Sequence, residues 1–361
     1  MRAVPHFDAV HNCSVLIKPS FLARKNPSMK SVLFITKKGQ EYSDSYGVAY
    51  TSSGLLNSAK FVVDMLKTHD VNAALVTVND NNDIDREVAK YNPDVVIIEA
   101  LWVVPEKLSI LTRLHPNVKW VVRVHSEVPF LAQEGIAIQW LFDYLKQDNV
   151  YVSFNSLRAL HDFMRVSWSN RLLYLPNYFP VKKEVHKDIK SGIINIGCFG
   201  AIRPLKNQLI QALSAIRFAD LESKILRFHM NTARVEGGHE VLKNIRALFA
   251  NTGHILVEHG WLHHHRFQHL LSHMDLSMCV SFSETFCLVA ADSVSMRVPL
   301  VCSPEVHWSS KLSQAEPTSM DSIVDAMYRV LRYKRLTGFL NRSGLKEYDL
   351  RSTEVWLQFL K

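Results

Sequence analysis

Residues 193–216 read IINIGCFGAIRPLKNQLIQALSAI, which predicts a strand, a turn and a helix in succession. The run 193–200 is short, apolar and bounded by a turn, as expected of a strand buried on both faces. Gly200 and Pro204 mark the turn. The apolar residues that follow recur at helical spacing: Leu209, Ile210, Leu213 and Ile216. Strand, turn and helix units of this kind build parallel α/β sheets.

Similar apolar runs alternate with helical patterns along the whole chain. A first series lies at 31–38, 73–80, 94–104, 119–126, 150–156 and 171–177. A second series lies at 193–200, 225–231, 254–261, 276–283 and 299–304. Because continuous apolar runs are typical of strands between two helix layers, the sequence predicts two parallel α/β sheets.

A polar segment separates the two series. PVKKEVHKDIKSG (180–192) has no hydrophobic face, and we interpret 181–192 as a linker. The chain then divides into an N-terminal domain at 1–180 and a C-terminal domain at 193–338. We expect 339–361 to form a helix that packs back on the N-terminal domain. Since ligands of open α/β sheets bind beyond the carboxyl ends of the strands, two facing domains predict a central cleft.

The composition is that of a folded protein without a membrane span. Of the 361 residues 47% are hydrophobic and 21% charged, and no segment approaches the roughly 20 apolar residues that cross a bilayer. The first residues, MRAVPHFDAVHNC, carry charge and proline where a secretory signal would need an apolar run, so we expect a cytoplasmic protein. The five cysteines occur singly, which argues against a disulfide framework and a zinc knuckle.

The net charge of +8 indicates attraction to an anion, which could be a nucleotide, a nucleic acid or an acidic membrane surface. Between 9 and 40 there is no acidic residue, and the cations are Lys18, Arg24, Lys25, Lys30, Lys37 and Lys38. A second basic cluster consists of Arg329, Arg332, Lys334 and Arg335. Solvated surface is the alternative interpretation of both clusters.

Two basic residues lie beside the start of the helix in 193–216. Arg203 can clamp phosphate oxygens with two hydrogen bonds, and Lys206 adds a mobile point charge. Together with the backbone N–H groups of the helix start they predict a site for a doubly charged phosphate group. A solvent-exposed basic turn is the alternative.

A second informative stretch, MDLSMCVSFSETFCLVAADSVSMRVPLVCSP (274–304), predicts a strand, a helix and another strand. Glu284 is expected at the helix entrance, with Asp292 about 12 Å further along the axis. One carboxylate could bond sugar hydroxyls while the other bonds a ribose. The alternatives are an ordinary helix N-terminal carboxylate for Glu284 and a solvated helical position for Asp292.

Together these stretches resemble the C-terminal domain of the retaining GT-B glycosyltransferases of glycosyltransferase group 1, also called family 4. That family has a Gly-rich strand end leading to Arg and Lys, then a Glu-x7-Glu signature and a Gly-Val-Pro strand. The corresponding segments here are GAIRPLKN (200–207), ETFCLVAAD (284–292) and RVPLV (297–301). Asp292 replaces the second Glu, and Arg297 stands where Gly is usual. The resemblance implies two Rossmann-like domains that face a central cleft.

The resemblance extends into the N-terminal half. RVHSEVPF (123–130) is similar to a family strand that ends in a His beside the donor sugar. It implies this role for His125, with Glu127 offset by one from the usual acid. YGVAYTSSGLLNSAKFVVDML (46–66) is similar to a loop that approaches the donor phosphate or the acceptor. Its candidate residues are Gly47, Ser53 and Gly54.

The resemblance also implies a set of donor contacts around the phosphate and the base. WLHHHRF (261–267) matches the family loop whose backbone contacts the nucleotide base. Besides Arg203, Lys206, Glu284 and Asp292, the implied donor-binding residues are Gly200, Asn231, Trp261, Leu262, Thr285 and Phe286. Three consecutive histidines cannot all point at one ion, and the resemblance implies neither a metal nor another cofactor.

The implied activity is transfer of a hexose or pentose from a nucleoside-diphosphate sugar, most often a UDP-sugar, with retention of configuration. Negative charge grows on the leaving phosphate in the oxocarbenium-like transition state. We expect Arg203 and Lys206 to stabilise that charge, Glu284 to orient the sugar and His125 to line the reacting face.

The acceptor is less well determined by the sequence. A hydroxymethylated base in duplex DNA, as used by GT-B base glycosyltransferases of bacteriophages, would explain the two basic clusters as phosphate contacts. A lipid-linked or polysaccharide acceptor at an anionic membrane would use the same cations. We favour DNA because the basic segments lack the interleaved large apolar residues of a membrane-inserting helix. A non-catalytic nucleotide-binding or nucleic-acid-binding module stays open, as Asp292 and Arg297 depart from the family pattern.

Overall fold

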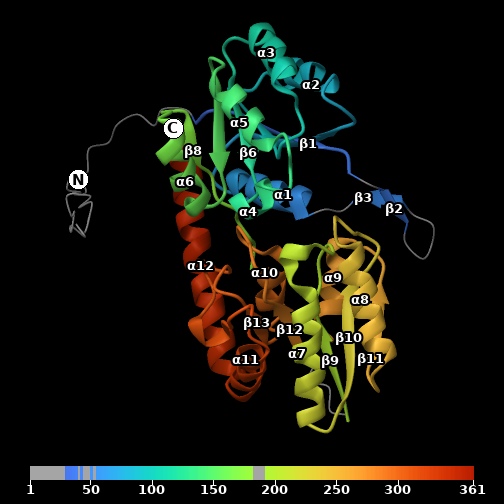
Figure 1. Ribbon diagram of the computed structural model, residues 1–361. Helices are drawn as coiled ribbons and strands as arrows, with labels where there is room; N and C mark the ends of the chain where they lie inside the picture. Colours follow the sequence, from blue (N-terminus) through green and yellow to red (C-terminus); the bar gives the residue numbers. More distant parts are fainter. Residues whose placement is uncertain (1–28, 40, 44–48, 52–53, 182–191) are drawn as a thin grey trace, which may run out of the picture.

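The computed structural model describes residues 29–39, 41–43, 49–51, 54–181 and 192–361. Two α/β domains lie one above the other, each built on a parallel sheet (Figure 1). This confirms the predicted fold class. The proposed linker lies almost entirely outside the described residues, which exclude 182–191.

The N-terminal sheet has six parallel strands in the order β4-β1-β5-β6-β7-β8. Their bounds are β1 Val32–Lys37, β4 Ala73–Val78, β5 Val95–Glu99, β6 Lys119–Val124, β7 Val150–Phe154 and β8 Leu172–Tyr174. A small antiparallel pair, β2 Glu41–Ser43 and β3 Ala49–Thr51, follows β1. That pair was not predicted, since three-residue strands carry too little pattern to stand out from a loop.

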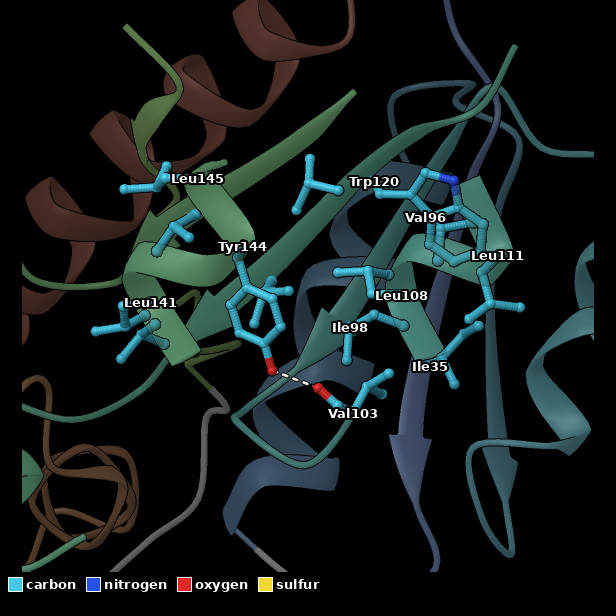
Figure 2. Packing of buried hydrophobic residues seen from close by; sticks show 14 of the residues in the cluster. Ile35, Val96, Ile98, Val103, Leu108, Leu111, Trp120, Leu141, Tyr144 and Leu145 are labelled. Carbon is cyan, nitrogen blue, oxygen red and sulfur yellow. Dashed lines mark hydrogen bonds between the residues drawn. The ribbon is translucent and has the colours of Figure 1, made fainter. Parts of the chain in front are cut away.

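Helices cover both faces of this sheet. The helices are α1 Gly54–Lys67, α2 Asp83–Tyr91, α3 Pro105–Leu114, α4 Val128–Leu131, α5 Ala137–Leu145 and α6 Leu157–Ser167. One face packs against α2, α3, α5 and α6, and the other packs against α1 and the C-terminal helix. Figure 2 shows the first core, where the hydroxyl of Tyr144 donates to the backbone oxygen of Val103 beside Leu108 and Trp120. Strands buried on both faces explain the continuous apolar runs of the sequence.

The C-terminal sheet has five parallel strands in the order β11-β10-β9-β12-β13. Its strands are β9 Ile193–Gly197, β10 Ile225–Asn231, β11 Ile255–His259, β12 Leu276–Cys279 and β13 Leu300–Cys302. Its helices are α7 Gln208–Leu221, α8 His239–Ala250, α9 His264–Leu271, α10 Leu288–Ser295 and α11 Met320–Arg332. Short 3-10 turns occur at Pro204–Lys206 and Lys311–Ser313.

The last helix, α12 Lys334–Phe359, joins the two domains. It runs beside the C-terminal domain and ends against the N-terminal one (Figure 1). Trp356 and Leu360 are fully buried in the N-terminal core, and the ring of Trp356 lies 5.5 Å from that of Phe34. The indole N–H of Trp356 donates to the backbone oxygen of Pro176 at 2.9 Å. Among the described helices, none is both long and apolar enough to cross a bilayer.

The apolar run 94–104 is only partly a strand. β5 ends at Glu99 because Ala100 takes a left-handed backbone conformation, with φ of 70°, which turns the chain out of the sheet. The indole N–H of Trp102 then donates to the backbone oxygen of Glu99 at 2.9 Å, and α3 begins at Pro105. The apolar residues after Glu99 therefore lie in a turn and do not extend the strand.

Asp349 on α12 is a buried carboxylate where the chain crosses between the domains. Its Oδ1 accepts a hydrogen bond from the backbone N–H of Phe179 at 2.9 Å. Burial raises the pKa of Asp349 to about 7 from an ordinary 3.8, against the opposing effect of that hydrogen bond. Because the pKa of Asp349 is higher in the folded protein than in the unfolded chain, the folded protein binds more protons than the unfolded chain does. The stability that this group contributes is therefore complete below about pH 4 and is lost as the pH rises through 7.

The change Asp349→Asn keeps the acceptor for Phe179 and removes the charge. We expect the free energy of unfolding of the variant to exceed that of the wild type by up to roughly 4 kcal/mol at pH 8. At pH 5 this difference in free energy should be less than half as large. Denaturant midpoints of both proteins at the two pH values measure this. Asp325→Asn, at an exposed position of α11, is the matched control and should show no pH-dependent gap. A constant difference between Asp349→Asn and wild type would contradict the assignment.

Candidate active site

A cavity of about 440 Å³ lies between the two domains at the carboxyl ends of both sheets. This volume is in the range of small-molecule sites. The structure brings most of the predicted site residues together on its walls: Gly54, His125, Gly200, Arg203, Lys206, Asn231, Trp261, Leu262, Glu284, Thr285, Phe286 and Asp292. Within the described residues, no three His, Cys, Asp or Glu side chains converge to hold a metal ion.

Glu127 is not on the cavity wall. Its buried carboxylate accepts hydrogen bonds from the hydroxyl of Ser156 and, at 3.2 Å, from Nε of Arg158. The other nitrogens of Arg158 donate to Glu305 of the C-terminal domain at 3.0 and 2.6 Å. Glu127 thus supports a bridge between the domains, because its position at the start of α4 turns it towards α6. The two loop candidates Gly47 and Ser53 lie outside the described residues.

Lys206 and Glu284 form an ion pair in the cavity. The Nζ of Lys206 lies 2.5 Å from Oε1 of Glu284, which also accepts from the hydroxyl of Ser281 at 2.8 Å. Burial disfavours the charged ammonium, but the Glu284 carboxylate outweighs it and raises the pKa of Lys206 above its usual value. Lys206 is therefore fully charged at neutral pH and positioned by a carboxylate.

The helix start that faces the cavity is that of α10, not that of α7. Asn207, just before α7, has a φ of 57°, and its amide donates to the backbone oxygens of Val280 and Pro317 behind the cavity. Neither Asn207 nor Gln208 lines the cavity, whereas Arg203 and Lys206 do, so the phosphate contact expected at the start of α7 stays a prediction. The first residues of α10, Leu288 and Val289, line the cavity instead, so the positive end of that helix dipole faces the ligand space.

Glu284 also lies off the helix that was expected to carry it. α10 begins at Leu288, after Cys287 in a left-handed conformation with φ of 64°. Glu284 sits in the loop between β12 and α10, so the helical rise of about 12 Å to Asp292 does not apply. This places the Glu284 carboxylate beside Lys206 rather than along one helix face.

Asp292 is buried, and one of its carboxylate oxygens contacts two side chains of α9. Its Oδ1 accepts from Nε2 of Gln268 at 2.8 Å and lies 2.7 Å from Nε2 of His264. The alternative of a solvated helical position is therefore wrong. The ring of His264 lies 5.5 Å from the ring of Phe61 on α1, so this cluster also contacts the N-terminal domain.

Three further charged residues on the wall were missed by sequence reasoning: Glu134, Arg234 and Glu236. Glu236 pairs with Arg203, whose Nε lies 2.5 Å from Oε2, and with Nε of Arg234 through Oε1. The guanidinium carbon of Arg203 lies 4.8 Å from the ring of Phe130, and that of Arg234 lies 5.1 Å from the ring of Trp261. Both stacks are cation–π contacts that fix the guanidinium planes.

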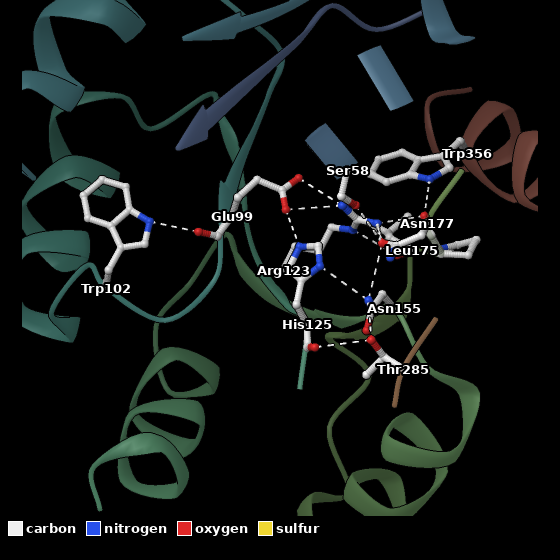
Figure 3. A network of polar contacts seen from close by, with 11 residues as sticks. Ser58, Glu99, Trp102, Arg123, His125, Asn155, Leu175, Asn177, Thr285 and Trp356 are labelled. Carbon is white, nitrogen blue, oxygen red and sulfur yellow. Dashed lines mark hydrogen bonds and ion pairs between the residues drawn. The ribbon is translucent and has the colours of Figure 1, made fainter. Parts of the chain in front are cut away.

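His125 belongs to a buried polar network (Figure 3). The carboxylate of Glu99 accepts two hydrogen bonds from Nη1 of Arg123, at 3.0 and 3.2 Å, and one from Nε2 of His125. Burial lowers the pKa of His125, although Glu99 opposes this. The ring is therefore neutral at pH 7, with its proton on Nε2, and its Nδ1 lies 3.4 Å from the side-chain nitrogen of Asn155.

The same network reaches into the C-terminal domain through Thr285. Its hydroxyl donates to the backbone oxygen of His125 at 3.3 Å and accepts from the amide of Asn155 at 3.1 Å. Arg123 also donates to the backbone oxygens of Leu175 and Pro176 and to Oδ1 of Asn177. The loop after Glu284 is thereby tied to the strand end that carries His125.

Two sequence signals could have revealed part of this arrangement. Glu99 and Arg123 are opposite charges inside apolar runs, and they are direct neighbours in the β5–β6 register. Arg297 stands where the family that the sequence resembles usually has Gly, and its φ of 60° is the left-handed conformation that glycine adopts without strain. The backbone at this position thus keeps the conformation that the family's glycine would allow.

Several solved structures are similar to this chain over nearly its whole length. Sucrose-phosphate synthase from Thermosynechococcus elongatus is 13% identical, with a TM-score of 0.63, over 90% of this chain and 95% of that chain. HepE from Anabaena, in complex with UDP-glucose, is 12% identical, with a TM-score of 0.60, over 90% and 95%. An E. coli trehalose-6-phosphate structure bound with UDP-2-fluoro glucose is 11% identical, with a TM-score of 0.62, over 91% and 99%.

The likeness is one of architecture rather than of sequence. No family model matches the sequence, and a search of curated proteins found no similar one. At 11–13% identity the solved structures establish the fold alone. With its two Rossmann-like domains facing a central cleft, this chain is a GT-B fold protein.

Proposed function

We propose that this protein is a glycosyltransferase that binds a UDP-sugar in its interdomain cleft and transfers the sugar, with retention, to a hydroxyl acceptor. The observation that carries the proposal is the convergence of Arg203, Lys206 and Glu284 at the start of α10, opposite His125. Two similar structures hold UDP-glucose and UDP-2-fluoro glucose, which supports UDP as the nucleotide.

The cations of the cleft match the charge that the reaction creates. As the bond from the anomeric carbon to the diphosphate breaks, negative charge grows on the leaving oxygen. Arg203 and Lys206 stabilise this charge, together with the dipole of α10. The acceptor oxygen bonds to the anomeric carbon on the same face, and its proton passes to an oxygen of the departing diphosphate. Glu284 then orients the sugar hydroxyls and holds Lys206.

His125 has a shaping role in this proposal. Its ring is neutral, Nε2 donates to Glu99, and Nδ1 lies 3.4 Å from the side-chain nitrogen of Asn155, so both ring nitrogens have a partner and neither is a free base. The buried Arg123 and Glu99 pair fixes the orientation of the ring. His125 therefore lines the sugar subsite and helps to exclude water from it.

We propose a small carbohydrate-type acceptor rather than duplex DNA. The basic cluster from Arg329 to Arg335 lies around the start of α12, at the end of the C-terminal domain away from the cleft (Figure 1). Arg329 also donates to the backbone oxygens of Leu312 and Gln314, so it stabilises the domain itself. Lys18, Arg24 and Lys25 lie outside the described residues. Asn57 and Ser126 provide polar groups on the wall of the cavity that the N-terminal domain supplies.

Mass spectrometry on the protein incubated with UDP-, GDP- and ADP-sugars tests this function. Each donor is offered with a panel of mono- and disaccharides and with hydroxymethylated duplex DNA. We expect UDP release and a sugar-modified saccharide, and unchanged DNA. Modified DNA would overturn the acceptor assignment. Absence of binding and turnover for all three nucleotide classes would overturn the donor assignment.

A further inference from the structure

Glu236 bridges two arginines on the wall of the cavity. Its Oε2 pairs with Arg203 and its Oε1 pairs with Arg234, so both carboxylate oxygens are engaged. The three side chains are 31%, 26% and 30% exposed, in the order Glu236, Arg203, Arg234, and all three line the cavity. The carboxylate therefore occupies the place between two guanidiniums that an anionic ligand would take.

The backbone builds this bridge. The N–H of Ile202 donates to the backbone oxygen of Arg234, and the N–H of Glu236 donates to the oxygen of Ile202, both at 2.9 Å. Gly238 permits this close approach, since a Cβ there would lie 2.6 Å from the oxygen of Ile202. Arg203 and Glu236 are thus neighbours because their chain segments are paired, not because two long side chains happen to meet.

The two arginines determine the ionisation of Glu236. Burial alone would raise the pKa of Glu236, but Arg203 and Arg234 outweigh it and lower the pKa below its usual value. Glu236 is therefore ionised at neutral pH. Glu134, from the N-terminal domain, also lines the cavity, and burial raises its pKa, as does Glu236, while Arg203 opposes the shift. A second negative charge beside Glu236 is thus disfavoured.

We propose that Glu236 is a resident counter-ion of the phosphate subsite, which pairs with Arg203 and Arg234 and yields them to the donor's diphosphate when the donor binds. This inference rests on the proposed function, because it concerns the same site. A ligand must displace a carboxylate that makes charge-assisted bonds to two guanidiniums. Glu236 therefore weakens the binding of every anion here, and it favours ligands that carry two or more negative charges.

Titration calorimetry of Glu236→Gln with UDP and with inorganic pyrophosphate tests the competition. Glutamine has the same shape but no charge, so the arginines should become available to the ligand. We expect both ligands to bind roughly 10- to 100-fold more tightly than to wild type, the range for one charge-assisted hydrogen bond. Glu236→Ala removes the acceptor altogether and should shift affinity in the same direction.

The matched control is Glu240→Gln, which removes the same charge from an exposed residue in the first turn of α8 that does not line the cavity. It should leave both affinities within about twofold of wild type, because exposed charges are screened. Unchanged or weaker binding by both Glu236 variants would overturn the inference, since Glu236 would then only position the arginines.

The two probes separate this inference from the proposed function. If the wild type turns over UDP-sugars but the Glu236 variants bind pyrophosphate no more tightly, the inference alone is wrong. If no nucleotide-sugar binds or reacts but the variants gain pyrophosphate affinity, the anion site stands and the proposed transferase activity is wrong.

Discussion

Replacing Lys206 by methionine is expected to lower the rate of sugar transfer by roughly 100- to 1,000-fold, the usual effect of removing one preorganised group that stabilises transition-state charge. The Nζ of Lys206 lies 2.5 Å from the carboxylate of Glu284, on the wall where the leaving diphosphate is proposed to bind. Methionine keeps the length of the side chain and its apolar packing but removes the charge. Initial rates with a saturating UDP-sugar measure the loss.

Two further variants make the Lys206 result specific. Lys224→Met, at a surface residue whose partner is Glu222, should transfer sugar at the wild-type rate. Lys206→Met also leaves the partly buried Glu284 without its cation, which should lower the thermal stability. The double variant Lys206→Met with Glu284→Gln should therefore recover thermal stability but not sugar transfer. Near-normal transfer by Lys206→Met would remove this residue from the reaction.

Arg123→Met is expected to destabilise the folded protein by about 3–5 kcal/mol, which is the usual cost of stranding a buried charge. Arg123 and Glu99 are both fully buried, and their carboxylate–guanidinium contacts lie at 3.0 and 3.2 Å. The substitution leaves the buried Glu99 carboxylate with the neutral ring of His125 and without its guanidinium. It also removes the donors to the backbone oxygens of Leu175 and Pro176. Denaturant unfolding, followed at the N-terminal domain, measures the loss.

A surface ion pair provides the comparison for Arg123→Met. Arg246 makes two hydrogen bonds to Glu258 at 2.8 and 2.6 Å, but its side chain is 54% exposed. Arg246→Met should cost less than about 1 kcal/mol, because solvent screens such pairs. If Arg123→Met with Glu99→Gln is less destabilised than the sum of the single variants, the charges are coupled, as contacting residues should be. If Arg123→Met and Arg246→Met lowered the free energy of unfolding equally, burial of the Arg123–Glu99 pair would not explain the effect at Arg123.

The apolar runs of this sequence predicted the fold correctly because parallel strands between helix layers are apolar on both faces. The run 225–231 coincides with β10, and the runs that begin at 73 and 193 start where β4 and β9 start. The carboxyl ends were predicted too long, most of all in the run 94–104, where apolar residues continue after β5 ends at Glu99. Ala100 ends one such strand through a left-handed backbone, which no hydrophobicity pattern contains.

The site was predictable where a sequence motif contains the residue, and not where a tertiary contact between loops brings the residue to the wall. Arg203, Lys206 and Glu284 lie on one wall, as the motifs indicate. Glu236 reaches the same wall only because its loop pairs with Ile202, which is a tertiary contact. The orientation of the first turn of α7 also could not be predicted from the sequence. It depends on the side-chain amide of Asn207, which donates to the backbone oxygens of two residues far away in the chain.

The placement of α12 has a consequence for how this protein is made. Trp356 completes the core beneath β1 and bonds Pro176, a residue 180 positions earlier in the chain. At about 5–20 residues per second, the ribosome needs roughly 10–40 s to translate that stretch. During this time the first sheet has been synthesised, but the face that packs against α1 lacks the part of its cover that α12 supplies. We therefore expect the nascent N-terminal domain to bind chaperones until Trp356 and Leu360 have left the exit tunnel.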